Sequence, residues 1–183
     1  MKELILGGAR SGKSRWAQER ALATGLSVTY IATATAQDAE MAQRIRQHRD
    51  QRPSHWQLIE EPRALAATLQ QHAAPDRCLL VDCLTLWLSN VLLPHGSDAG
   101  DTAHDTPTAD LFEQERAALH AVLPGLPGHV ILVSNEIGLG VVPLGALTRR
   151  YCDETGRLHQ DLAALCDRVT FMVAGLPHLL KGA

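Results

Sequence analysis

The segment from Gly7 to Ser14, with the sequence GGARSGKS, constrains the fold more than any other part of the chain. It follows a short apolar run and leads into a helix-like stretch, which is the context that the phosphate-binding pattern G-x-x-x-x-G-K-[ST] needs. Gly7 and Gly12 let successive N–H groups face one concavity at a helix N-terminus, where the dipole favours anions. A glycine-rich turn that matches by chance is the alternative. The residues expected to hold a nucleoside triphosphate are Gly7, Gly8, Ala9, Arg10, Ser11, Gly12, Lys13 and Ser14.

Two side chains of this loop and one acidic residue carry the expected chemistry. Lys13 is expected to reach the β- and γ-phosphates, and the Ser14 hydroxyl to bind Mg²⁺. Asp82 closes the apolar run 78–81, which is typical of a strand buried on both faces. In a chain with a phosphate loop, an aspartate at such a strand tip is the expected second Mg²⁺ ligand. The alternative role of Asp82 is to cap the following helix.

Apolar strand-like runs alternate with helix-like segments along the chain. Strands are expected over residues 4–6, 27–33, 56–60, 78–82, 129–134 and 169–175. Helices are expected from the glycine loop to 24, over 38–52, from 62 onward, and over 84–93, 106–124, 144–151 and 156–166. This order predicts the α/β class: a single P-loop NTPase domain over residues 1–183, with a mostly parallel sheet and helices on both faces.

Composition and charge exclude several classes of function. The chain has 183 residues, 45% of them hydrophobic, which suits one domain with a full core. Its net charge of −3 gives no basic field, so nucleic acid is not expected as a partner. No signal-like or membrane-spanning run occurs, and we expect a cytoplasmic protein. The four cysteines show no C-x-x-C spacing, which favours buried thiols over zinc ligands or disulfides.

One histidine lies on the apolar face of a predicted helix. In the segment 38–52, Met41, Ile45 and His48 fall at spacings that place them on one side. A histidine there is more often a core residue than a catalyst. The arginines at 46, 49 and 52 suit anionic phosphates, and their alternative is a solvated helix face.

Three other segments are expected to bear on a ligand site or an interface. Thr33 and Thr35 follow a predicted strand, at the end where α/β sheets bind ligands, although strand-end or cap chemistry explains them equally well. Polar residues at 135–136, followed by two glycines, predict a shaped loop on the same side. The helix 84–93 is apolar nearly all round, so it is expected to be buried in the domain or against another subunit. Residues 94–107 are expected to form a mobile loop.

With these residues in view, the chain resembles the bifunctional adenosylcobinamide kinase/adenosylcobinamide-phosphate guanylyltransferase family of cobalamin synthesis over nearly its whole length. The phosphate loop alone indicates only a superfamily, whereas the His48 segment followed by the Asn135-Glu136 loop is a much narrower signature. The matching segments are 7–15, 30–33, 44–49 with 52–53 and Trp56, Glu60, Asp82 with 84–85 and Asn90, 135–140 with 142–143, and 174–177.

The resemblance implies two reactions on one scaffold. In the first, ATP or GTP phosphorylates the aminopropanol hydroxyl of adenosylcobinamide. In the second, GMP passes from GTP to that phosphate through a guanylyl-histidine, and pyrophosphate is released. His48 occupies the position of the family's histidine, and Mg²⁺ is the implied cofactor. A neutral imidazole is a good nucleophile toward phosphorus near neutral pH, which fits this role.

The resemblance also implies nucleotide contacts and an assembly. Beyond the phosphate loop, the corresponding nucleotide-binding positions are Thr33, Ala34, Thr35, Arg49, Asp50, Gln51, Arg52, Glu60 and Asp82. Family members form trimers, so a homotrimer is expected, with the apolar segment 84–93 as the candidate for part of the interface. The chain departs from the family at His159-Gln160, where an Asn-Gln pair is common.

Two other functions stay open at this point. A plain small-molecule kinase would use only the phosphate loop and Mg²⁺, and His48 would then be structural. A regulatory GTPase or an ATP-driven partner protein would have no metabolic substrate. The chain has no N-K-x-D guanine-reading pattern, so a switch GTPase would need base recognition from other residues.

Overall fold

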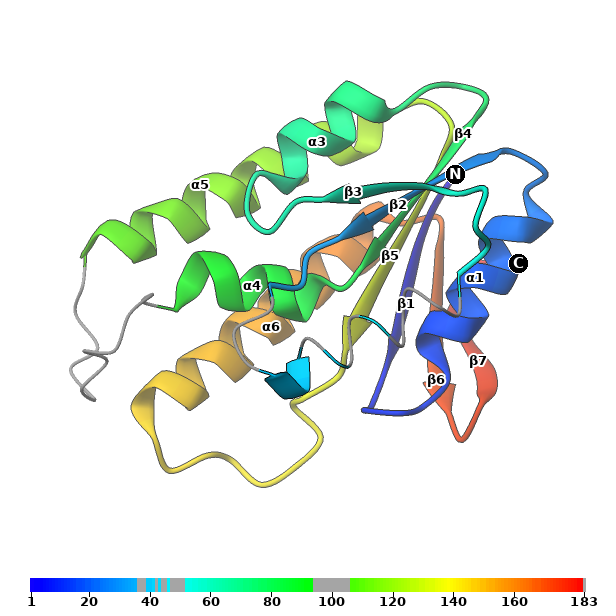
Figure 1. Ribbon diagram of the computed structural model, residues 1–183. Helices are drawn as coiled ribbons and strands as arrows, with labels where there is room; N and C mark the ends of the chain where they lie inside the picture. Colours follow the sequence, from blue (N-terminus) through cyan, green and yellow to red (C-terminus); the bar gives the residue numbers. More distant parts are fainter. Residues whose placement is uncertain (36–38, 42, 44–45, 47–51, 94–105, 183) are drawn as a thin grey trace.

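A seven-stranded sheet forms the centre of the structure, a computed structural model that describes residues 1–35, 39–41, 43, 46, 52–93 and 106–182, without the side chains of 106–110 (Figure 1). The strands are β1 (Lys2–Gly7), β2 (Ser27–Ala32), β3 (Gln57–Glu60), β4 (Arg77–Asp82), β5 (His129–Asn135), β6 (Arg168–Val173) and β7 (Leu176–Lys181). Their order is β3-β2-β4-β5-β1-β6-β7, and every neighbouring pair is parallel except β6 and β7. The predicted α/β class with a mostly parallel sheet is confirmed.

Helices pack on both faces of this sheet. They are α1 (Lys13–Ala23), α3 (Leu65–His72), α4 (Leu84–Leu92), α5 (Thr106–Val122), the short 3₁₀ helix η1 (Leu123–Gly125) and α6 (Ala146–Leu165). Among these, α1 lies on one face, and α3, α4, α5 and α6 lie on the other (Figure 1). None of the helices described is long and apolar enough to cross a membrane.

The buried strand β1 shows why the sheet needs cover on both sides. All six of its residues are buried. Because successive side chains of a strand point to opposite faces, Leu4 and Leu6 join the larger core, while Ile5 packs in the second core with Ala17 and Ala21 of α1. A continuous apolar run is the expected sequence of a parallel strand covered on both faces.

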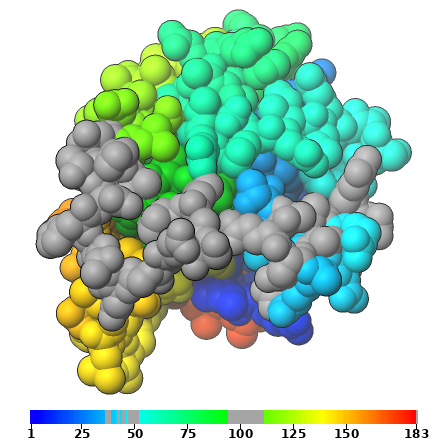
Figure 2. Space-filling model, turned by 60° about the vertical axis from the view of Figure 1, so that its left-hand side comes forward, coloured from blue at the N-terminus to red at the C-terminus, as the bar shows by residue number. Residues whose placement is uncertain are grey.

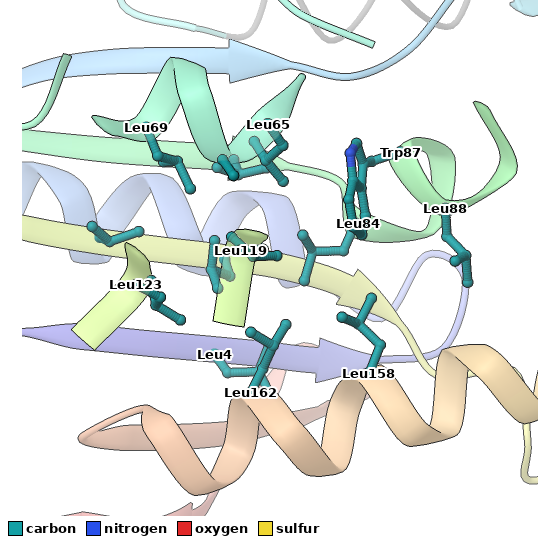
Figure 3. Packing of buried hydrophobic residues seen from close by; sticks show 14 of the residues in the cluster. Leu4, Leu65, Leu69, Leu84, Trp87, Leu88, Leu119, Leu123, Leu158 and Leu162 are labelled. Atoms are coloured by element: carbon teal, nitrogen blue, oxygen red, sulfur yellow. The ribbon is translucent and has the colours of Figure 1, made fainter. Parts of the chain in front are cut away.

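Helix α4 lies inside the larger core and not at the surface. Leu84, Trp87 and Leu88 are fully buried, and side chains from β1, α3, α5 and α6 surround them (Figure 3). The indole N–H of Trp87 donates to the carbonyl of Arg63 at 2.7 Å. Of the two predicted alternatives for this segment, burial in the domain is the one that the structure shows, because the chain's own helices cover Leu84, Trp87 and Leu88.

Two predicted boundaries near the C-terminus are also wrong. The helices expected at 144–151 and 156–166 are one continuous helix, α6. Gly156 lies inside this helix. A glycine there destabilises a helix by about 1 kcal/mol, and the burial of Leu158 and Leu162 offsets this cost. The strand expected to run to residue 175 ends at Val173. A turn with positive φ at Ala174 and Gly175 then reverses the chain into β7, an exposed edge strand.

The four cysteines are all free thiols, as predicted. Cys78, Cys83 and Cys166 are buried, and Cys152 is half-buried. Burial raises the pKa of Cys78 and Cys166 to about 12 and that of Cys83 to about 11. These three thiols are therefore protonated at neutral pH, which fits a packing role.

Candidate active site

The predicted phosphate loop connects the end of β1 to the start of α1, and close contacts require two of its three glycines, Gly7 and Gly12. A Cβ on Gly7 would lie 2.6 Å from the carbonyl oxygen of Met172. Gly12 has φ +95, and a Cβ there would lie 3.2 Å from the Cα of Gly175. The amide of Gly175 in turn donates to the carbonyl of Ser11 at 2.9 Å. The turn between β6 and β7 thus supports the loop.

Two polar side chains of the loop are buried. The Ser11 hydroxyl oxygen is buried and has no hydrogen-bond partner within the described part of the chain. Lys13 is 7% exposed, and its Nζ donates to the carbonyl of Gly8 at 2.7 Å. Burial lowers the pKa of the Lys13 ammonium, and the nearby Asp82 carboxylate opposes this effect. Phosphate oxygens are the acceptors that both groups can use.

Asp82 lies at the carboxyl end of β4, where the sequence predicts a Mg²⁺ ligand. The Tyr30 hydroxyl donates to its Oδ2 at 3.0 Å, so Oδ1 is not used by this bond. Burial and the adjacent carboxylate of Asp82 raise the pKa of Tyr30 well above its ordinary value. The residue that caps α4 is Cys83, with no side-chain cap bond, so the alternative role of Asp82 as a helix cap is not what the structure shows. A Ser hydroxyl and one carboxylate fit Mg²⁺, which keeps waters and takes its other ligands from phosphates.

Other predicted contacts line up along the same edge of the sheet. Ala32 pairs with Asp82 on one side and with Glu60 on the other, so the two acids end the strands on either side of β2 at one level. The guanidinium carbon of Arg52 lies 4.2 Å from the centre of the Tyr30 ring. Arg52 is thereby held against the residue that donates to Asp82. His48, Arg49, Asp50 and Gln51 lie outside the described residues.

Thr33 belongs to the fold and not to the ligand surface. It is fully buried, its hydroxyl donates to the Cys83 carbonyl at 2.7 Å and also accepts from the Cys83 amide, and its carbonyl accepts from Asn90 at 2.8 Å. Its polar atoms are therefore occupied, and the strand-end alternative is the one that the structure supports. Ala34 is half-buried and Thr35 is exposed, so only these two of the three reach the surface.

The residues at the tip of β5 are not among the site residues that the sequence predicts. The Glu136 amide donates to the carbonyl of Gly7 at 2.9 Å, which joins this tip to the phosphate loop. Asn135 Nδ2 donates to Thr85 Oγ1 at 2.7 Å. The sequence signal for this tip is two polar residues directly after a predicted buried strand. It predicts a loop on the ligand side of the sheet but assigns no role to either side chain.

The loop after β5 projects from the body of the molecule. It forms the yellow segment between β5 and α6 in both overall views (Figures 1 and 2). Its apolar side chains are exposed, with Val141 at 96% and Leu144 at 97%. An exposed apolar group of this kind next to a ligand site indicates a surface that another molecule covers.

A glycine cradle ending in a buried lysine, with an aspartate two strands away in a parallel sheet, defines a P-loop nucleoside triphosphate-binding domain. Comparison of the sequence with known families narrows this class. Residues 3–180 match the family described as "Cobinamide kinase / cobinamide phosphate guanyltransferase", and the chain belongs to that family. It is therefore an enzyme of cobalamin biosynthesis with the two activities that the family name states.

Curated relatives cover the chain from end to end. The "Bifunctional adenosylcobalamin biosynthesis protein CobP" of Pseudomonas aeruginosa is 59% identical over 182 residues, which span 100% of this chain and 98% of the relative. The "Bifunctional adenosylcobalamin biosynthesis protein CobU" of Salmonella typhimurium is 39% identical over 99% of this chain and 100% of its own length. Among solved structures, that of the RadB recombinase aligns with a TM-score of 0.47 and 15% identity, over 93% of this chain and 73% of that chain. The resemblance predicted from the sequence is confirmed.

Proposed function

We propose that the chain phosphorylates adenosylcobinamide with ATP or GTP and then transfers GMP from GTP to adenosylcobinamide phosphate. The second reaction passes through a guanylyl group on His48 and gives adenosylcobinamide-GDP and pyrophosphate. Family membership supports the two activities. The phosphate donors, the histidine intermediate and the contact residues are part of this proposal.

The phosphate loop would hold the triphosphate in both reactions. Lys13 and the loop amides bind the β- and γ-phosphates, and the Ser11 hydroxyl gains the acceptor that it lacks within the described residues. Ser14 and Asp82 would hold Mg²⁺, which when bound offsets charge on the phosphates. Ala34, Thr35, Arg49, Asp50, Gln51, Arg52, Glu60 and Asp82 are the further nucleotide contacts in this proposal.

The contact of Arg52 with Tyr30 supports the assignment of His48 as the guanylylated residue. Arg52 lies over the Tyr30 ring, and the Tyr30 hydroxyl donates to Asp82, so the residue four positions after His48 is held beside the proposed Mg²⁺ ligand. An extended chain spans at most about 3.6 Å per residue, so the covalent reach from Arg52 to residue 48 is about 14 Å.

The chemistry of the second reaction suits an imidazole. A nitrogen–phosphorus bond forms at the α-phosphorus while the bond to the α,β-bridging oxygen breaks, and pyrophosphate leaves. An oxygen of the cobinamide phosphate then attacks the same phosphorus, and the nitrogen–phosphorus bond breaks. Because the attacking phosphate is already an anion, this transfer needs no base.

Incubation with adenosylcobinamide, GTP and Mg²⁺, followed by mass spectrometry, tests the proposal. The wild-type chain should form first the phosphate and then the GDP derivative. His48→Ala should accumulate the phosphate and form no GDP derivative, whereas the exposed residue His55 can be changed to alanine as a matched control without effect. If His48→Ala still forms the GDP derivative, the histidine assignment is wrong. If the wild type stops at the phosphate, the chain is a plain kinase.

The homotrimer and the cytoplasmic location also belong to this proposal. Four free thiols suit a reducing compartment. The exposed apolar residues Leu139, Val141, Val142 and Leu144 are a surface that a second subunit could cover, in place of the buried helix α4. Val141→Asp should then lower the mass in sedimentation equilibrium from trimer to monomer. A wild-type monomer at micromolar concentration would contradict the assembly.

A further inference from the structure

A serine, a histidine and a glutamate form a row at the end of β5. Ser134 Oγ lies 2.7 Å from Nε2 of His159, and Nδ1 of the same ring lies 3.5 Å from Oε2 of Glu136. Ser134 and Glu136 flank the strand tip, and His159 comes from α6, which runs along this face of the sheet (Figure 1). The row uses both ring nitrogens of a buried histidine.

The burial of the three side chains shows which of them a substrate can contact. Ser134 is fully buried and His159 is 6% exposed, whereas the Glu136 side chain is 21% exposed. A buried serine cannot attack a substrate, so the row does not act as a hydrolase triad. The carboxylate is the member at the open end, and the serine and histidine stand behind it.

The backbone places this carboxylate beside the phosphate loop. In the sheet, Ser134 pairs with Leu6 and Asn135 with Gly7, and the Glu136 amide then donates to the Gly7 carbonyl at 2.9 Å. Strand β5 lies between β1 and β4, so its tip stands between the loop that holds Lys13 and the strand that ends at Asp82. The tip of β5 therefore lies next to the loop that is expected to hold the triphosphate.

We infer, on the basis of the function proposed above, that Glu136 is the general base that accepts the proton of the acceptor hydroxyl in the kinase reaction, and that His159 positions it. The hydroxyl oxygen forms a bond to the γ-phosphorus, and the bond from that phosphorus to the β,γ-bridging oxygen breaks. The hydroxyl proton passes to Glu136, and the products are the phosphate ester and a nucleoside diphosphate.

Two contacts hold the carboxylate in place for this role. The Gly138 amide donates to Oε1 at 2.6 Å, and a Cβ on Gly138 would lie 3.1 Å from the same oxygen. His159 presents Nδ1–H to Oε2 when Ser134 donates to Nε2, which is the tautomer that satisfies all three groups. Burial lowers the pKa of His159, and Glu136 opposes this effect. The ring therefore acts as a neutral donor near pH 7.

The two half-reactions differ in their need for this base. The kinase acceptor is a neutral hydroxyl, which must lose a proton when it attacks. The guanylyl transfer uses a neutral imidazole and then a phosphate anion, and neither step requires proton removal by Glu136. A base should contribute about 10²–10⁴-fold to the first reaction alone.

Glu136→Gln separates this role from a structural one, because a glutamine oxygen still accepts from the Gly138 amide. We expect kcat of cobinamide phosphorylation to fall at least about 100-fold. Guanylyl transfer from GTP to preformed cobinamide phosphate should stay within about 3-fold of wild type, as should GTP affinity. An equal fall in both reactions, or no fall in either, overturns the assignment. A wild type that makes no cobinamide phosphate overturns the proposed function as well.

Substitutions at His159 test the positioning role. Asparagine keeps a donor near the place of Nδ1, whereas leucine removes it. The kinase kcat should fall more in His159→Leu than in His159→Asn, and guanylyl transfer should change little in either. If the two variants lose kinase activity equally, or if transfer falls with it, His159 does not act through Glu136.

Discussion

Each end of the sheet contains a glutamate–histidine pair, and the two pairs differ in how far the carboxylate is exposed to solvent. At the amino end, Glu3 is 1% exposed and accepts hydrogen bonds from Arg20 at 2.6 and 3.0 Å and from His129 at 2.9 Å. At the carboxyl end, Glu136 keeps 21% of its side chain exposed, and its histidine lies 3.5 Å away. The first pair is closed to ligands, and the second is not.

The difference indicates that the amino end of the sheet serves the stability of the fold and that the carboxyl end serves ligand binding. A buried carboxylate with all its partners fixes β1, β5 and α1 to one another at the amino end. At the carboxyl end, a carboxylate remains accessible and the buried Ser11 hydroxyl lacks a partner in the described part of the chain. A carboxylate that stays accessible and a polar group without a protein partner are expected where a ligand binds.

Two buried lysines lie near the two ends of β1, and substituting them should give the largest difference in turnover between the two ends of the sheet. Lys13 Nζ donates to Gly8, and Lys2 Nζ donates to Leu126 at 2.6 Å. Lys13→Met should lower the turnover of both half-reactions by at least about 100-fold, because a preorganised donor to the phosphates is lost. The matched variant Lys2→Met should keep turnover within a few-fold. Steady-state assays of both variants test this contrast, and equal losses would contradict it.

Replacing the two glutamates should have unequal effects on the free energy of unfolding. Glu3→Gln breaks a buried ion pair with Arg20, and we expect the free energy of unfolding to fall by about 3 kcal/mol. Glu136→Gln should change it by less than about 1 kcal/mol, because the carboxylate is partly solvated. Urea denaturation at pH 7 measures both values. Similar losses in the two variants would show that the carboxyl-end pair is as structural as the other.

Acid should weaken the amino-end pair within a defined range. Burial acts to raise the pKa of Glu3, but hydrogen bonds from His129 and Arg20 outweigh it and lower the pKa from 4.5 to about 2. A depressed pKa stabilises the fold by roughly 3 kcal/mol above pH 4.5, and this contribution is lost as the pH falls toward 2. The difference in unfolding free energy between wild type and Glu3→Gln should therefore shrink between pH 5 and pH 3. A constant difference across that range would contradict the lowered pKa of Glu3.

The smallest effect is expected at Ser11. Ser11→Ala removes a buried hydroxyl that lacks a partner in the described structure, so the free energy of unfolding should stay level or rise by up to about 1 kcal/mol. Nucleotide affinity should fall a few-fold, because the hydroxyl is expected to donate to a phosphate oxygen. Urea denaturation and GTP titration measure the two quantities. A loss of stability with unchanged affinity would mean that the hydroxyl serves the fold.

Local patterns account for the parts of the candidate site whose position in the fold the sequence predicts correctly. The phosphate loop is specified within eight consecutive residues, and its required glycines at 7 and 12 are visible in the sequence itself. Asp82 follows from a buried strand that ends in an acid. In both cases the information lies in neighbouring positions, so no knowledge of tertiary contacts is needed.

Long-range contacts explain what the sequence does not predict. His159 and Ser134 are 25 residues apart, and no spacing rule joins a helix residue to a strand tip at that distance. The hydroxyl of Thr33 is taken by the backbone of Cys83, 50 residues away, which its sequence neighbours do not indicate. Strand β7 is exposed along its length and therefore has no apolar alternation to mark it.

Labelling with GTP that carries radioactive phosphorus at the α-position tests whether His48 forms a guanylyl-histidine. The protein should gain acid-labile label in the presence of Mg²⁺, and the label should map to His48 after proteolysis. His48→Ala should remove it, while His55→Ala and Glu136→Gln should retain it. A wild-type protein that gains no label, or label that persists in His48→Ala, would contradict a guanylyl-histidine on this scaffold.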